Sequence, residues 1–249
     1  MRSAKPSRPF VVLFLVLLSF RADANDLTLK SSAGLVVADS ELASAAGMEI
    51  LKRGGNAVDA AIATAFALSV VDQASSGLGG GGFMVIYRAK DQRSFALDFR
   101  ETAPRASTRE LYMKDGKPVA SLSLTGALAV GVPGEVAGLV EARKRFGTLS
   151  LAALLTPAIK LASDGFPLDA TLRIAIERQQ SGMKRFADLG RIFMPNGEVP
   201  KEGEVIRQAE LAETLKAIAQ QGVEVFYRGR IAEAIVETIK NNGGVMTLD

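Results

Sequence analysis

The protein has 249 residues, of which 48% are apolar and 23% are charged, as in ordinary globular proteins. This composition excludes a disordered tail, a collagen-like repeat and a low-complexity linker, and the length suits one or two domains. The chain has no Cys and no His, which excludes disulfides, thiol nucleophiles, Ser-His triads and the common zinc sites. Any catalysis by this chain must use carboxylates, amines, hydroxyls or backbone amides, and we expect neither a cofactor nor a metal.

The first 24 residues are typical of a secretory signal peptide. Three basic residues precede the apolar run 10–20, and Ala-Asp-Ala at 22–24 is typical of a cleavage site. The run is shorter than the roughly 20 residues that span a bilayer; the alternative is an uncleaved anchor. We expect the mature protein to begin near Asn25, to be periplasmic or extracellular, and to leave the membrane once the signal is removed.

The basic character of the chain is confined to this segment. Residues 1–24 carry four basic side chains and one acidic side chain, which accounts for the whole net charge of +3. The remaining residues are therefore balanced in charge. They show no basic stripe, so we expect no nucleic-acid partner.

Apolar patterning and capping residues predict the elements of the first half. Residues 34–38 are expected to form a strand, and Ser40 to cap a helix that ends at Gly54-Gly55. Asn56 should cap an Ala-rich helix over 57–71, which is apolar enough to be buried under a sheet. Two strands, expected at 83–88 and 94–100, form a hairpin.

The second half is predicted to be mainly helical. Residues 105–125 should be irregular and exposed, with a turn at 114–118. Helices are expected near 135–146, 150–163, 169–180, 208–221 and 229–241, with Pro157 near the first turn of the second one, where Pro is tolerated. The predicted organisation is a signal peptide at 1–24, a strand and helix part at 25–130, and a mainly helical part at 131–249.

The glycine-rich stretch 77–82 satisfies the pattern GxGxxG. A dinucleotide-binding loop follows a strand and opens a helix, whereas here a helix precedes the loop and a strand follows it. Nucleotide binding is therefore disfavoured. The alternative is that these glycines allow close backbone approach or positive φ.

The most informative polar cluster is Asp98-Phe99-Arg100-Glu101. Alternation along a strand places Asp98 and Arg100 on one face, and the planar guanidinium of an Arg at a strand end can bind a carboxylate through two hydrogen bonds. The alternative, which the residue pattern alone favours, is a structural ion pair of Arg100 with Asp98 or Glu101.

Four hydroxyl side chains are candidate nucleophiles by residue type, but none has a base nearby in sequence. We therefore interpret them as turn and capping residues; they are Ser75, Ser76, Thr125 and Thr247.

Taken together, the motifs GGNAVDAA, SSGLGGGGF, DFRETAP and AVGVPGEVAGL, in this order, resemble the gamma-glutamyltransferases, also called gamma-glutamyltranspeptidases or glutathione hydrolases. The resemblance covers about residues 33–249. It implies an α/β fold of the N-terminal nucleophile hydrolase type, a four-layer αββα sandwich, in a precursor that cuts itself into a large and a small subunit. The cut frees a Thr whose α-amine is the general base. That Thr takes the gamma-glutamyl group of glutathione and passes it to water or to an amino acid or peptide acceptor.

This sequence matches only the beginning and middle of a large subunit in that family. The segment that bears the nucleophile is not found in it, so we expect no catalytic residue in this chain, a truncated C-terminal end, and a separate small catalytic subunit as partner. The resemblance assigns Arg100 to the α-carboxylate of the gamma-glutamyl group. We further infer that Glu101 orients the guanidinium or its neighbours. The alternative is a non-enzymatic relative that keeps the fold without the nucleophile.

Overall fold

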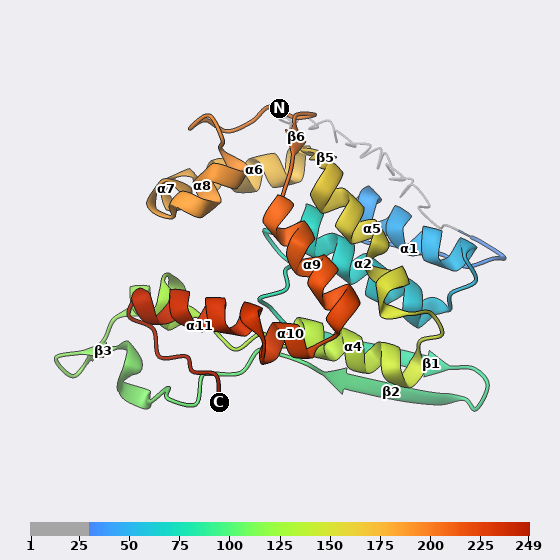
Figure 1. Ribbon diagram of the computed structural model, residues 1–249, viewed down its shortest axis with the longest axis horizontal. Coiled ribbons are helices and arrows are strands. Elements are labelled where there is room, and N and C mark those ends of the chain that lie inside the picture. The colour runs from blue at the N-terminus through green and yellow to red at the C-terminus, as the bar shows by residue number, and fades with distance from the viewer. Residues whose placement is uncertain (1–29) are drawn as a thin grey trace, which may run out of the picture. The chain divides into compact units, whose positions relative to one another are not determined.

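The computed structural model describes residues 30–249 (Figure 1). The contacts separate Met1–Ala33 from a second unit, Gly34–Asp249, and the fold described below is that of the second unit. The predicted signal peptide and its cleavage site lie outside the described residues. Among residues 30–249 no helix is both long enough and apolar enough to span a membrane.

The second unit is mainly helical, with three short two-stranded sheets among the described residues. The α-helices are α1 (Glu41–Lys52), α2 (Ala57–Val71), α3 (Ala120–Leu124), α4 (Glu135–Phe146), α5 (Leu151–Asp164), α6 (Ala170–Arg178), α7 (Gln180–Arg185), α8 (Ala187–Phe193), α9 (Ala209–Gln221), α10 (Glu224–Tyr227) and α11 (Arg230–Asn241). The strands and 3₁₀ helices are β1 (Phe83–Arg88), β2 (Arg93–Asp98), η1 (Arg109–Tyr112), β3 (Met113–Lys114), β4 (Lys117–Pro118), η2 (Ala127–Ala129), β5 (Phe166–Pro167) and β6 (Val205–Ile206).

Helix α2 is the centre of the core. It packs against α1, α5 and α4, and α5 in turn packs against α9 (Figure 1). Its Ala-rich surface allows these close approaches, and Ile62 and Phe66 are completely buried. A capping box begins the helix: the Asn56 side chain accepts from the Asp59 backbone N–H, and the Asp59 carboxylate accepts from the Asn56 backbone N–H.

The hairpin of β1 and β2 lies beside α4 (Figure 1). Its antiparallel register pairs Phe83 with Asp98 and Arg88 with Arg93. Two backbone hydrogen bonds between Gly82 and Phe99 continue the ladder one step beyond β2. Every second side chain of β1 points to solvent in the described structure, so the hairpin presents an apolar face at Phe83, Val85 and Tyr87.

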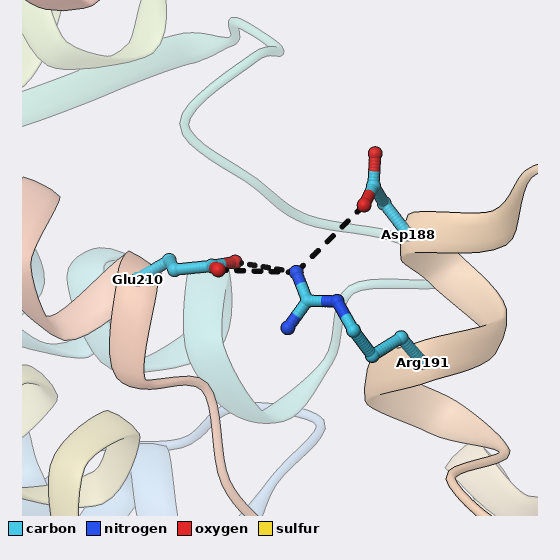
Figure 2. Close-up of polar contacts among 3 residues, drawn as sticks. All are labelled: Asp188, Arg191 and Glu210. Carbon is cyan, nitrogen blue, oxygen red and sulfur yellow. Dashed lines mark hydrogen bonds and ion pairs between the residues drawn. The ribbon is translucent and has the colours of Figure 1, made fainter.

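Helix α8 is joined to the core helix α9 by an exposed ion pair (Figure 2). Arg191 Nη2 donates to both carboxylate oxygens of Glu210, at 3.1 and 2.8 Å, and lies 3.8 Å from Asp188 Oδ1. The hydrogen bond to Glu210 raises the pKa of Arg191. All three side chains are solvent-exposed, so the pair adds little to stability.

Most predicted elements are confirmed. The helix predicted at 57–71, the strand at 83–88 and the helix at 135–146 have the observed bounds, and the other four long helices after residue 149 agree to within two residues at each end. The second strand of the hairpin ends at Asp98, two residues earlier than predicted. The irregular stretch 105–125 contains η1, the small β3–β4 hairpin at the predicted turn, and α3.

The strand predicted at 34–38 is wrong. These residues are in no strand, and Leu35 and Val37 expose 50% and 75% of their surface. A strand is stabilised by hydrogen bonds to a neighbouring strand, and no strand in the described part of the chain pairs with this segment. The prediction that α2 lies under a sheet is also wrong for the described residues, because its main contacts are with helices.

Two local predictions are corrected as well. Ser40 precedes α1, but its side chain makes no capping hydrogen bond. Pro157 is the seventh residue of α5 and lies inside the helix, beyond the first turn, where it is buried. Its ring removes the hydrogen bond to the preceding turn, a cost that burial against the core offsets. By contrast, Gly54 has φ +87°, which confirms its predicted role in ending α1.

Candidate substrate-binding site

Arg100 and Glu101 lie directly after the hydrogen-bonded end of the hairpin. Arg100 follows Phe99, whose backbone pairs with Gly82, and the Arg100 backbone N–H donates to the Asp98 carboxylate at 3.1 Å. The position of the backbone at residue 100 is therefore fixed by the hairpin and by the hydrogen bond to the Asp98 side chain.

The two predicted site residues are brought together as an ion pair. Arg100 Nε lies 3.3 Å from Glu101 Oε2, while 60% of the Arg100 side-chain surface remains exposed. The sequence left open a pair with Asp98 or with Glu101. In the structure the Arg100 guanidinium pairs with Glu101, and the Asp98 carboxylate accepts the Arg100 backbone N–H. The exposed guanidinium is accessible to an anionic ligand.

Glycines allow two chain segments, the glycine-rich loop and the start of α4, to approach Phe99 closely. A Cβ atom added to Gly81 or to Gly134 would collide with the Phe99 carbonyl oxygen, and one added to Gly138 would collide with the Phe99 ring. Of the two roles that the sequence left open for the glycine-rich stretch, close approach is therefore the one seen at Gly81. None of its glycines has positive φ.

Backbone hydrogen bonds hold these segments in place. The Gly80 carbonyl accepts from the backbone N–H groups of Gly134 and Glu135, at 2.8 and 3.0 Å. An isolated β-bridge joins Thr102 to Val132. The start of α4 is thus fastened to both sides of the Arg100–Glu101 segment, so the two side chains stand on a rigid support.

Sequence reasoning missed two side chains near this segment, Glu135 and Tyr227. Tyr227 donates its hydroxyl hydrogen to the Pro133 carbonyl at 2.9 Å and accepts from the Ala137 backbone N–H at 3.1 Å. Burial, and then the charge of Glu101, raise the pKa of Glu135. Burial and the Glu135 charge also raise the pKa of Tyr227, although the Ala137 hydrogen bond opposes them. The sequence signal for Glu135 was the motif that contains it, and its proximity to the charge of Glu101 depends on the fold.

A large hollow in the described structure lies elsewhere. It measures about 970 Å³, is bordered by the glycine-rich loop and by α6, α7 and α8, and includes neither Arg100 nor Glu101 in its walls. Two of the four hydroxyl candidates, Ser76 and Thr125, line it. Among residues 30–249, no group of three or more Asp or Glu side chains is arranged to hold a metal ion.

Comparison with known proteins identifies the family. A family model described as gamma-glutamyltranspeptidase matches residues 43–249. The chain belongs to the gamma-glutamyltranspeptidase family. It is 44% identical over 216 residues to the glutathione hydrolase proenzyme of Bacillus subtilis (strain 168), covering 86% of this chain and 37% of that protein. For the Escherichia coli (strain K12) glutathione hydrolase proenzyme the identity is 41%, covering 88% and 38%.

A solved structure supports the same family assignment. The fold matches that of Helicobacter pylori gamma-glutamyltranspeptidase with a TM-score of 0.86 and 38% identity, over 89% of this chain and 64% of that one. The predicted class, a mixed helix and sheet fold of the N-terminal nucleophile hydrolase type, is therefore confirmed. This member of the gamma-glutamyltranspeptidase family spans somewhat more than a third of the length of the curated relatives named above.

Proposed function

We propose that this chain is the N-terminal part of the large subunit of a gamma-glutamyltransferase that acts on glutathione and related gamma-glutamyl compounds. A Thr hydroxyl from the rest of the protein attacks the gamma-carbonyl, and the amine leaves with a proton as the Thr ester forms. Water or an amino acid or peptide acceptor then takes the glutamyl group and restores the Thr hydroxyl. Among these steps, the residues described here serve substrate binding.

Arg100 is the observation that carries this proposal. It stands on a fixed backbone, its guanidinium is exposed, and it lies in the segment that matches the family motif. A gamma-glutamyl group carries a free α-carboxylate, whose two oxygens match the parallel N–H donors of a guanidinium. The ion pair with Glu101 does not oppose this role, because it is made through Nε and leaves 60% of the Arg100 side-chain surface exposed.

The exposed apolar surface of the hairpin supports the proposal that another subunit packs against it. Phe83, Val85 and Tyr87 expose most of their surface on one face of β1, and Leu35 and Val37 are exposed in the unpaired segment before α1. Apolar surface of this kind is typical of a face that another segment covers. We propose that the small catalytic subunit, which carries the nucleophile, covers these residues.

The full-length protein and the isolated chain should differ in activity. We expect purified full-length protein to cleave itself in two and to release the chromophore from a gamma-glutamyl anilide, whereas residues 25–249 alone release none. The isolated chain should also aggregate, because its apolar face is uncovered. Turnover by the isolated chain that survives repurification would show that a nucleophile lies within it. A full-length protein that cleaves itself but has no activity on any gamma-glutamyl donor would refute the proposed function.

Export is part of the proposal. The basic residues, the short apolar run and the Ala-Asp-Ala motif at 22–24 support cleavage after Ala24 and a periplasmic or extracellular mature protein. N-terminal sequencing of the protein recovered from outside the cytoplasm should begin at Asn25. Replacing Ala24 by a bulky residue should block the cut and retain the precursor. An intact Met1 terminus on cytoplasmic protein would contradict this prediction.

A further inference from the structure

The start of helix α4 has no capping side chain of its own. Its N-cap residue is Gly134, so the first N–H groups of the helix need acceptors from elsewhere. The Gly80 carbonyl accepts from two of them, those of Gly134 and Glu135. Ala137, the third residue of the helix, usually donates to a capping side chain. Here its N–H donates at 3.1 Å to the hydroxyl of Tyr227, which lies 90 residues later in the sequence.

The Tyr227 hydroxyl is hydrogen-bonded on both sides. It accepts from the Ala137 N–H and donates to the Pro133 carbonyl at 2.9 Å, so a single hydroxyl bridges the two ends of the turn that enters α4. The tyrosine itself is held in place by its neighbours. Helix α10, which ends at Tyr227, packs against α9 and α11 (Figure 1), and the buried ring of Phe226 lies edge-on to the Tyr227 ring at 5.0 Å.

This turn lies directly against the candidate site. A Cβ atom added to Gly134 would collide with the Phe99 carbonyl oxygen and would lie 3.0 Å from the Arg100 carbonyl oxygen. Just before the turn, Val132 exchanges two backbone hydrogen bonds with Thr102, at 3.2 and 2.8 Å. The turn therefore contacts the backbone on both sides of residue 100, and a displacement of the turn displaces the backbone that carries the guanidinium.

We propose that Tyr227 is a positioning residue for substrate binding. Its hydroxyl, by bridging Pro133 and Ala137, holds the turn against the Arg100–Glu101 segment and so sets the guanidinium for the α-carboxylate of the donor. Tyr227 acts through Arg100 and does not itself contact the substrate. This inference rests on the proposed function, which assigns the α-carboxylate to Arg100.

The Tyr227→Phe variant keeps the ring and removes both hydrogen bonds. In the full-length protein we expect KM for a gamma-glutamyl anilide to rise about three- to tenfold. The kcat should stay unchanged, because the contact to the α-carboxylate is made equally in the ground state and in the transition state. Tyr112→Phe is the matched control, since the Tyr112 hydroxyl also donates to a backbone carbonyl, that of Leu128 at 3.2 Å, outside this turn. The control should keep the wild-type KM.

The double variant separates positioning from a general weakening of the protein. If Tyr227 acts through Arg100, adding Tyr227→Phe to Arg100→Ala should leave KM as it is in Arg100→Ala alone. Two effects that multiply in full, or a wild-type KM in Tyr227→Phe alone, would overturn the inference. A wild-type KM in Arg100→Ala is a different result, because it would refute the proposed carboxylate site itself.

Hydrogen exchange tests the same contact without relying on activity, so it applies even if the variant fails to cleave itself. In full-length Tyr227→Phe, the Ala137 amide loses its acceptor. Mass spectrometry should show faster exchange in peptides that cover 132–137 and also in those that cover 99–102, with no change in α9. Faster exchange confined to 132–137 would show that the turn does not hold the Arg100 segment, and would overturn the inference.

Discussion

Arg100→Ala should raise KM for gamma-glutamyl donors by a large factor in the full-length protein. The guanidinium is the exposed cation at the end of the hairpin, and its loss leaves the α-carboxylate of a bound donor without a counter-charge. Removing one partner of such a pair costs about 2–5 kcal/mol when the contact is desolvated, or about 30- to 5,000-fold in affinity. The measurement is steady-state kinetics with donors that keep or lack the α-carboxylate. The loss should be confined to the first kind.

Arg100→Lys tests the geometry of the contact. An ammonium keeps the charge but cannot make two parallel hydrogen bonds, so we expect a KM between those of the wild type and Arg100→Ala. Arg105→Ala is the matched control, since Arg105 is an exposed arginine five residues further along the chain. Both Arg100 variants should still cleave themselves. If they do so and keep the wild-type KM, Arg100 is only a structural ion-pair residue.

Local signals predicted the elements whose ends are set by local chemistry. Helix α2 has its predicted bounds because Asn56 and Asp59 form a capping box at its start. The hairpin was predicted from two apolar runs separated by a polar turn, and the structure has β1 and β2 there. The helix over 135–146 follows the Pro133-Gly134 sequence, which cannot continue a preceding helix.

Features that depend on distant residues were not predictable in the same way. An apolar run at 34–38 fits a strand, but pairing decides whether a strand forms, and no neighbour in the described residues supplies it. The short helices α7, α8 and α10 have between four and seven residues. That length gives too little periodicity to recognise. Of the helices that pack against α2, α4 and α5 lie about 80–100 residues later in the sequence.

In the candidate site, too, the residues close together in sequence were predictable and the contacts between distant segments were not. The motif that contains Arg100 and Glu101 is contiguous, so a resemblance could point to it. Glu135 reaches the site only because Gly80 accepts two backbone hydrogen bonds from the start of α4, and because Gly134 can approach Phe99 closely. Neither contact has a period or a spacing in the sequence that would reveal it.

The other large effect expected is on stability, at Asp59 in the first turn of α2. This carboxylate is completely buried and is surrounded by donors. It accepts from the backbone N–H groups of Asn56, Thr148 and Leu149, at 3.0, 3.0 and 3.3 Å, and from the Thr148 hydroxyl. It thus ties the start of α2 to the loop between α4 and α5, across about 90 residues of sequence.

Asp59→Asn should lower the free energy of unfolding by about 2–4 kcal/mol at neutral pH. The amide has one acceptor oxygen where the carboxylate has two, and its NH₂ group would face backbone N–H donors that it cannot satisfy. Urea unfolding of the full-length protein measures the difference. Asp169→Asn is the matched control, because Asp169 caps α6 through a single bond from the Leu172 N–H in an exposed position. Asn caps as well as Asp there, so the control should lose only a few tenths of a kcal/mol.

The pH dependence of stability separates this explanation from a simple packing defect. Burial opposes ionisation of Asp59, but the hydrogen bonds from Thr148, Asn56 and Leu149 outweigh it and lower its pKa. A lowered pKa means that the ionised carboxylate stabilises the fold above the pKa of the unfolded chain, about 4, and that this contribution is lost as the pH falls through the folded value. The stability difference between wild type and Asp59→Asn should therefore be constant from neutral pH down to about pH 4 and shrink below it. A difference that stays the same in acid would mean that the charge of Asp59 does not stabilise the fold, and that the variant is weakened by its altered packing alone.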